Sequence, residues 1–294
     1  MSADYFLSEQ EREQFRAQGY LGPYTLLEPE QMRILWSQVL RRSLQSTETS
    51  IYPENKHQFD RHLDIPVLRK LVARPQIVQR LQGVLGDDVL CWRSSWFPKN
   101  PGDEGTDWHQ TEVFAEFEGS AKLVPVEEHD NPFELTAWVA VTDATRENGC
   151  VQFIPGTHRQ PWRYDDLKQL NFRPDEINKL TKDGIKRGFY GYDASARKLD
   201  PHWRPDESQA VYMELKAGQF FFFTSRCIHA SLPNTSRDQL RLGLAIRYCS
   251  GDVRVYPDRD HWTFGGARFP LDRYRSMLVA GEDRYHHNKL WTES

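Results

Sequence analysis

The stretch 219–249, QFFFFTSRCIHASLPNTSRDQLRLGLAIRYC, contains two runs that predict buried strands. Residues 219–224 hold four consecutive phenylalanines, and residues 240–249 are rich in leucine, alanine and isoleucine. Runs of this length and composition, bounded by turn residues, are typical of strands. Three further aromatic or β-branched runs precede them, at 89–97, 135–142 and 150–154, and we expect Pro98 to end the first.

The residues before 87 predict helices instead. Residues 6–45 fit two helices, since 8–11 have capping-box spacing and 30–44 carry apolar residues at helical spacing. A short extended piece at 19–24 separates the two, a polar loop follows at 47–64, and 66–85 is again helical. Residues 157–208 form a long polar insertion.

Helices followed by several short strands predict a mainly β protein with an α-helical flank, built as a two-sheet barrel or sandwich. Among such architectures the jelly roll, a double-stranded β-helix of the cupin type, can house a metal between its sheets. We therefore predict a single domain over 1–294, with a helical flank at about 1–86 and a jelly-roll core at about 87–255.

The bulk composition narrows the possible partners and location. Charged residues make up 27% of the 294 and the formal net charge is −4, so neither nucleic acid nor an anionic membrane is indicated. Nine tryptophans suit a barrel interior or a buried pocket. No apolar leader or run of 18 apolar residues appears, so we expect a cytoplasmic location. The four dispersed cysteines predict reduced thiols: Cys91, Cys150, Cys227 and Cys249.

Two histidines fit a metal centre that lacks its usual third ligand. His109 begins a stretch with alternate residues facing inward, and His229 follows the strand at 219–224. A non-haem Fe(II) oxygenase normally binds iron through two histidines and one carboxylate. The carboxylate usually comes two residues after the first histidine, and here that residue is Thr111. A neutral threonine is a poor iron ligand, so either the site is inactive or another anion occupies the position.

Nearby residues are weaker candidates for the missing ligand. Glu112 lies three residues after His109, so a strand would point it to the opposite face. Glu116 would need a bend in the chain to turn inward. His158 follows a Pro-Gly turn and is more typical of a surface histidine than of a third imidazole ligand.

Two arginines share one face of the strand predicted at 240–249. Arg241 and Arg247 are six residues apart, an even spacing that points both side chains to the same side. Two guanidiniums on an inner face are costly to bury unless anions meet them, and a dicarboxylate would bind one of them bidentately. The alternative is that both arginines face solvent.

These segments resemble the phytanoyl-CoA dioxygenase superfamily of Fe(II)/2-oxoglutarate enzymes. The shared positions are Trp108-His109-Gln110, Gly149-Cys150, Pro155 to His158, and His229 with Arg241. Within the superfamily the chain is most similar to the syringomycin-type non-haem iron halogenases, over residues 91–93, 97–99, 101–110, 152–157, 182–184, 191–193 and 216–220. The likeness runs from about residue 5 to about residue 285, and 101–110 is its most specific part.

The resemblance implies a role for each candidate residue. His109 and His229 would hold Fe(II), and Arg241 would bind the distal carboxylate of 2-oxoglutarate. The same likeness puts Thr106 and Trp138 beside that cosubstrate. In the halogenases an alanine stands at the position of Thr111 and chloride occupies the vacated site, and the residues that support the chloride match Thr136 and Arg247.

The activity implied by the resemblance is chlorination, with O2 and 2-oxoglutarate, of an unactivated C–H bond. The substrate would be an aminoacyl group carried as a thioester on a peptidyl carrier protein. Two positions depart from the halogenase pattern: Thr111 replaces alanine, and Glu116 replaces an asparagine near the halide. The alternatives are a hydroxylase or other C–H oxidase, or a catalytically inactive relative that binds a carrier protein. Phe189 and Tyr190, in the insertion, are expected in a lid over the substrate.

Overall fold

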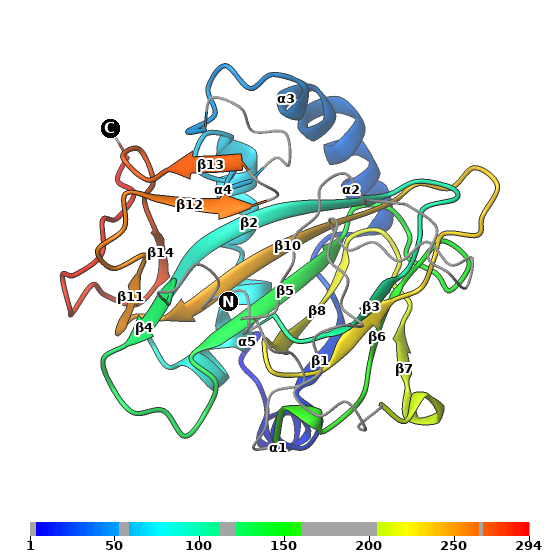
Figure 1. Cartoon of the computed structure of the whole chain (residues 1–294), viewed down its shortest axis with the longest axis horizontal. Helices are drawn as coiled ribbons and strands as arrows, with labels where there is room; N and C mark the ends of the chain where they lie inside the picture. Colours follow the sequence, from blue (N-terminus) through cyan, green and yellow to red (C-terminus); the bar gives the residue numbers. More distant parts are fainter. Residues whose placement is uncertain (1–3, 53–58, 112–120, 160–204, 265–266, 294) are drawn as a thin grey trace.

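The larger of the two main sheets is the central element of the fold. The computed structural model describes residues 4–52, 59–111, 121–159, 205–264 and 267–293. The long antiparallel strands of this sheet run across the centre of the molecule (Figure 1). In spatial order they are β1 (Tyr20–Thr25), β8 (Gln219–Thr224), β5 (Glu134–Ala140), β10 (Arg241–Ser250), β2 (Val89–Lys99) and β14 (Met277–Ala280).

A four-stranded sheet packs against the inner face of the first. Its order is β3 (Thr106–His109), β9 (His229–Ser231), β6 (Val151–Phe153) and β7 (Val211–Met213), with antiparallel pairing. Phe153 of this sheet meets Phe221 of β8 edge-on, with ring centroids 5.4 Å apart, and Phe221 stacks on Trp138. Aromatic contacts between the inner faces thus join the sheets. The predicted mainly β, jelly-roll architecture is confirmed.

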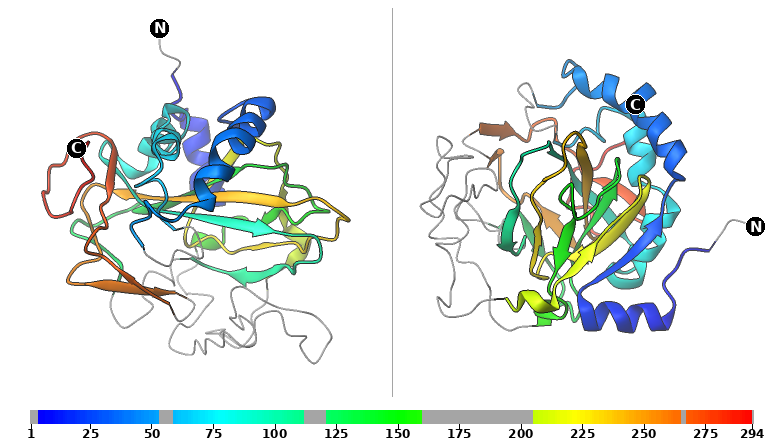
Figure 2. Two further views of the ribbon diagram at one scale, coloured as in Figure 1. Left: turned by 90° about the horizontal axis from the view of Figure 1, so that it is seen from above. Right: turned by 90° about the vertical axis from the view of Figure 1, so that its right-hand side faces the viewer.

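Helices cover the outer face of the larger sheet, on the side opposite the smaller sheet (Figure 2). Strand alternation sends Ala137 and Val139 of β5, and Phe220 and Phe222 of β8, to this outer face. Phe15 packs on Phe222 with ring centroids 5.6 Å apart. The helices are α1 (Glu9–Gln18), α2 (Pro29–Leu35), a π-helix (Trp36–Leu40), α3 (Arg41–Gln45), α4 (Pro66–Val72) and α5 (Pro75–Leu85).

Two small sheets and two 3-10 turns complete the described fold. β4 (Leu123–Pro125) pairs with β11 (Val253–Val255), and β12 (His261–Phe264) pairs with β13 (Ala267–Pro270). Trp262 and Phe269 stack with centroids 4.3 Å apart and form a second core with Tyr52. The turns are Thr157–Arg159 and Glu207–Gln209. Among the described helices, none combines the length and apolar character needed to cross a membrane.

Most predicted strands are confirmed, but Pro98 does not end β2. The strand continues to Lys99, and Pro98 pairs with Leu242 of β10. On its other side β2 meets β14 only at 89–91, so no described strand needs the missing N–H of Pro98. The helix predicted over 66–85 is instead two helices that separate before Pro75.

Candidate active site

The two histidines meet because β3 and β9 are neighbours in the smaller sheet. His109 pairs directly with His229 across these strands. Their ring centroids lie 4.2 Å apart and the rings are inclined by 51°. Both side chains are buried. Residues 120 positions apart are thus held as one pair by the backbone ladder.

Backbone hydrogen bonds fix the tautomer of both imidazoles. Nδ1 of His109 donates to the carbonyl of Asp107 at 2.7 Å, and Nδ1 of His229 donates to the carbonyl of Cys227 at 2.9 Å. Each ring therefore presents the lone pair of Nε2 for coordination, which is the usual arrangement of metal-binding histidines. Burial, and next the nearby His109, hold the pKa of His229 well below its usual value, so its imidazole is neutral.

Threonine hydroxyls lie where a carboxylate is expected. In the described part of the chain, no third His, Cys, Asp or Glu joins the pair in a metal-binding group. Thr111 lines the same cavity, and its backbone N–H donates to the carbonyl of Ser225 at 2.9 Å. The Oγ1 atoms of Thr111 and Thr136 are buried, and neither has a hydrogen-bond partner among the described residues. Two buried hydroxyls without a protein partner are suited to a water or an anion in the cavity.

One cavity of about 80 Å³ contains every residue that the sequence nominated for the site. This volume is several times the roughly 10–15 Å³ that a cavity needs to hold one water molecule. The nominated residues are Thr106, His109, Thr111, Thr136, Trp138, His229, Arg241 and Arg247. They come from β3, β5, β9, β10 and the residues after β3, and therefore from both sheets.

Arg241 lies at the end of the cavity formed by the start of β10. Its side chain is buried, and Nη1 donates to the carbonyl of Phe97 at 3.2 Å. The guanidinium carbon is 5.5 Å from the ring centroid of Trp138. Gly243, two residues along β10, allows this approach, because a Cβ there would lie 1.9 Å from the Trp138 ring. A planar cation beside an indole in a buried cavity suits a carboxylate ligand.

Lys99 is a functional candidate that the sequence did not reveal. It is opposite Arg241 in the β2–β10 ladder and is buried. Its Nζ donates to Oγ of Ser231 at 2.8 Å and to the carbonyl of Leu232 at 2.5 Å. Ser231 Oγ in turn donates to Oγ1 of Thr106 at 3.0 Å. Because Oγ1 of Thr106 accepts this hydrogen bond, the hydroxyl proton of Thr106 points away from Ser231.

Burial and the neighbouring guanidinium of Arg241 lower the pKa of Lys99 to about 6. Its side chain fits because position 149 is glycine. A Cβ on Gly149, where φ is +96°, would lie 2.6 Å from Cδ of Lys99. The only features of the sequence that pointed to Lys99 were the resemblance at 97–99 and at Gly149.

Arg247 and Arg93 add positive charge at the other end of the cavity. They are directly opposite each other in the β2–β10 ladder, and Thr136 pairs with Arg247 on the other side. Nη1 of Arg247 donates to Oγ of Ser95 at 3.2 Å. Burial and then Arg93 lower the pKa of Arg247. An anion between Arg247 and the threonine hydroxyls relieves this repulsion.

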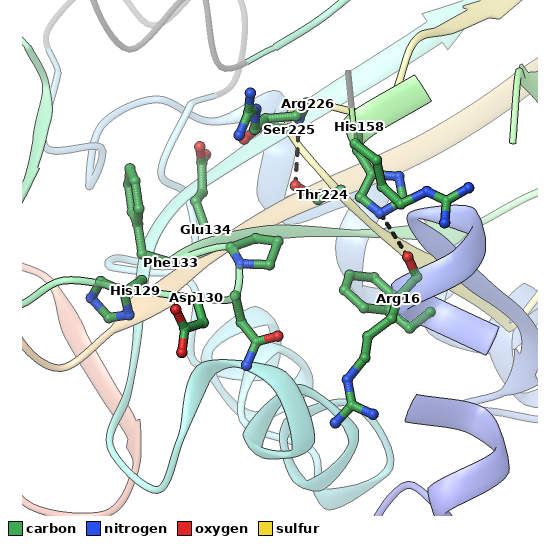
Figure 3. A pocket seen from close by; sticks show the side chains of 13 residues that line it. Arg16, His129, Asp130, Phe133, Glu134, His158, Thr224, Ser225 and Arg226 are labelled. Carbon is green, nitrogen blue, oxygen red and sulfur yellow. Dashed lines mark hydrogen bonds between the residues drawn. The ribbon is translucent and has the colours of Figure 1, made fainter. Parts of the chain in front are cut away.

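A second, larger pocket of about 650 Å³ lies beyond the end of β8 (Figure 3). Its walls come from α1, the segment before β5, the 3-10 turn Thr157–Arg159 and the turn after β8. His158 belongs to this pocket, where its Nε2 contacts the carbonyl of Arg16 at 3.2 Å. The structure thus separates His158 from the histidine pair. Glu112, Glu116, Phe189 and Tyr190 lie outside the described residues.

Comparisons with known proteins agree with this architecture. The family model for phytanoyl-CoA dioxygenase (PhyH) matches residues 15–243. A solved structure of CytC3 with Fe(II) and alpha-ketoglutarate superposes with a TM-score of 0.75 at 34% identity, and covers 98% of this chain and 94% of that chain. Peroxisomal phytanoyl-CoA dioxygenase of Rattus norvegicus is 25% identical over 64% of this chain and 47% of its own length.

A probable alpha-ketoglutarate-dependent hypophosphite dioxygenase of Stutzerimonas stutzeri is 23% identical over 75% of this chain and 63% of its own length. The chain thus spans less than two thirds of the length of these curated relatives.

Proposed function

The chain belongs to the phytanoyl-CoA dioxygenase family, and from this premise we propose that it is an Fe(II)- and 2-oxoglutarate-dependent halogenase. We propose as its substrate an aminoacyl group tethered to a peptidyl carrier protein. The observation that carries the halogenase proposal is the pair of unsatisfied hydroxyls, Thr111 and Thr136, beside two histidines that no described carboxylate joins.

The residues present fit a ferrous ion. His109 and His229 offer neutral Nε2 donors whose rings are already oriented, and imidazole is a suitable ligand for Fe(II). When bound, iron with 2-oxoglutarate and O2 supplies the oxidising power to cleave a C–H bond. The chain's own contribution is to bind, orient and keep one coordination position for an exogenous ligand.

Arg241, Thr106 and Trp138 suit the distal end of 2-oxoglutarate. Arg241 provides a bidentate cation for a carboxylate, and its bond to the Phe97 carbonyl holds it in place. Thr106 accepts from Ser231, so its own proton is available for a carboxylate oxygen. The cation of Arg241 and the hydroxyl of Thr106 thus favour an anionic cosubstrate at this end of the cavity.

Thr111, Thr136 and Arg247 suit chloride at the opposite end. Each hydroxyl can donate one hydrogen bond, and a bond to a charged partner is worth about 1.5–3 kcal/mol. Arg247 adds a positive field in a region shielded from water. Thr111 is larger than alanine, but its hydroxyl offsets the lost space by donating to the anion.

A hydroxylase is the second candidate, and the same threonines favour it. A hydroxyl both donates and accepts, so Thr111 and Thr136 can hold a water in place of chloride. In that case adding chloride does not change the product, because oxygen and not chlorine is incorporated into the substrate.

The test is an anaerobic titration followed by product analysis. Fe(II) and 2-oxoglutarate are added without O2, and the visible metal-to-cosubstrate band is followed as chloride is added. The proposal expects a saturable chloride-dependent shift and a chlorinated product on a loaded carrier protein. An unmoved band with a hydroxylated product supports the hydroxylase and contradicts the halogenase.

A further inference from the structure

The larger pocket adjoins the metal cavity through the inner face of β5. Trp138 and Thr136 line the metal cavity, and Glu134, two residues before Thr136, lines the pocket. Residues two apart on a strand share a face and lie about 6.6 Å from each other. The bond from Thr111 N–H to the Ser225 carbonyl makes a second link, because Ser225 lines the pocket. The pocket and the metal cavity are therefore neighbours.

The wall next to the metal cavity is acidic. The Glu134 side chain is buried, at 5% exposure, and lies close enough to Arg247 to favour the charged form of that guanidinium. Asp130 lines the same side of the pocket but is exposed (Figure 3). Glu134 is thus the carboxylate that a buried cationic group would meet.

The remote wall is basic. We call Arg16, His158 and Arg159 the basic cluster; Arg16 belongs to α1, and its carbonyl contacts Nε2 of His158. Burial lowers the pKa of His158, and the charges of Arg159 and Arg226 lower it further. Figure 3 shows Arg16 and His158 across the pocket from Asp130 and Glu134. The pocket therefore has opposite charges at its two ends.

We propose that this pocket binds the substrate, with a primary ammonium group at Glu134 and an anionic group at the basic cluster. The proposal rests on the proposed function and names how its substrate is recognised. A volume of about 650 Å³ is within the range of roughly 300–1,000 Å³ for small-molecule sites. An aminoacyl group supplies the ammonium. The anion is the phosphate of the phosphopantetheine arm.

This orientation selects the bond that reacts. With its ammonium at Glu134, the substrate places the carbons next to that ammonium nearest to Thr111 and Thr136. The anionic end stays at the basic cluster, away from the anion position of the metal cavity. Glu134 then determines the specificity for amines. Because the ammonium is held at Glu134, the negative charge of the substrate stays away from the halide.

The test measures the binding of four matched forms of each probe by calorimetry. The protein is kept anaerobic and is loaded with Fe(II) and 2-oxoglutarate. Aminoacyl phosphopantetheine thioesters with apolar, hydroxylated, basic and acidic side chains are compared with their N-acetyl forms, and both with the dephosphorylated pantetheine forms. Free amino acids form a separate arm. We expect N-acetylation to weaken binding about tenfold or more, as loss of a charge-assisted hydrogen bond does.

Variants assign the effect to residues. In Glu134→Gln, which keeps the shape, the free amine and the N-acetyl form should bind equally, and Glu134→Asp should restore part of the preference. The exposed Asp130→Asn on the same wall is the matched control and should keep the full preference. Loss of the phosphate should weaken binding in the wild type but not in Arg16→Gln combined with Arg159→Gln. A free amino acid carries its ammonium and carboxylate on one carbon and cannot span the pocket, so it should bind more weakly than its thioester; equally tight binding contradicts a role for the basic cluster.

Equal binding of free and N-acetylated probes to the wild type overturns the proposal. So does the absence of binding by every probe at millimolar concentration in protein whose visible band still responds to chloride, and in that case the halogenase proposal stands. If the amine preference follows Glu134 but chloride never moves the band, the pocket assignment holds and the halogenase proposal fails.

Discussion

Replacing Lys99 with methionine removes a buried titratable amine while keeping the length of the side chain. Lys99 lies beside Arg241, and the pKa of its ammonium falls from 10.5 to about 6 because of burial and that guanidinium. A folded-state pKa below the unfolded value means that the proton destabilises the folded protein. The unfolded chain holds this proton up to pH 10.5, whereas the folded protein releases it above about pH 6.

The stability of the ligand-free protein should therefore rise with pH between these values. One group contributes at most about 1.4 kcal/mol per pH unit, or about 2 kcal/mol between pH 7 and 8.5. In Lys99→Met this contribution is absent, so the free energy of unfolding should rise less steeply with pH. Urea unfolding at several pH values measures the difference. Lys216→Met, at an exposed lysine whose side chain is 69% accessible, is the control.

The same variant should weaken 2-oxoglutarate binding. Lys99 orients Ser231 and through it Thr106, so its removal leaves the Thr106 proton undirected. Loss of one hydrogen bond to a charged group is worth about 1.5–3 kcal/mol, roughly tenfold to a hundredfold in affinity. In the wild type, calorimetry in two buffers of different ionisation enthalpy should also show that a proton is taken up when 2-oxoglutarate binds. In the variant, the proton uptake that Lys99 contributes should be absent. An unchanged pH slope together with unchanged affinity refutes this reasoning.

Further substitutions give separate outcomes. Thr111→Asp supplies the missing carboxylate, so the anaerobic visible band should become insensitive to chloride; a band that still shifts contradicts the site assignment. Arg241→Lys loses the bidentate geometry and should weaken 2-oxoglutarate about tenfold with iron content unchanged, as titration and metal analysis will show. Gly149→Ala should cost about 2–4 kcal/mol in urea unfolding, because it combines a positive φ with clashes at the Leu232 carbonyl and at Lys99. Gly102→Ala, with a similar φ of +84° but open space, should cost less, and equal costs would exclude the clash.

The long strands were predictable because their signal is local. The apolar runs at 219–224 and 240–249 match β8 and β10 to within one residue. The strands that carry the histidines, β3 and β9, contain four and three residues, which is too short for a periodic pattern. Their pairing depends on contacts made by the rest of the barrel. The prediction for Pro98 failed because the position of an edge depends on where β14 stops.

Site residues were predictable where a family motif marked them. The resemblance nominated eight of the fourteen described residues that line the metal cavity. Lys99 and Glu134 were missed because their roles come from contacts across strands, Lys99 with Ser231 and Glu134 with the pocket. A lone lysine after a proline, or a glutamate before a strand, carries no local signal of burial.

We propose that an exogenous anion, and not a protein carboxylate, completes the iron site beside Thr111. Anaerobic crystals with iron and 2-oxoglutarate, grown in bromide, allow anomalous diffraction at the bromine edge to locate the halide. We predict one strong bromide peak next to the iron, within hydrogen-bonding distance of the Thr111 and Thr136 hydroxyls. A carboxylate oxygen from the chain at that position, with no bromide peak, would contradict the claim.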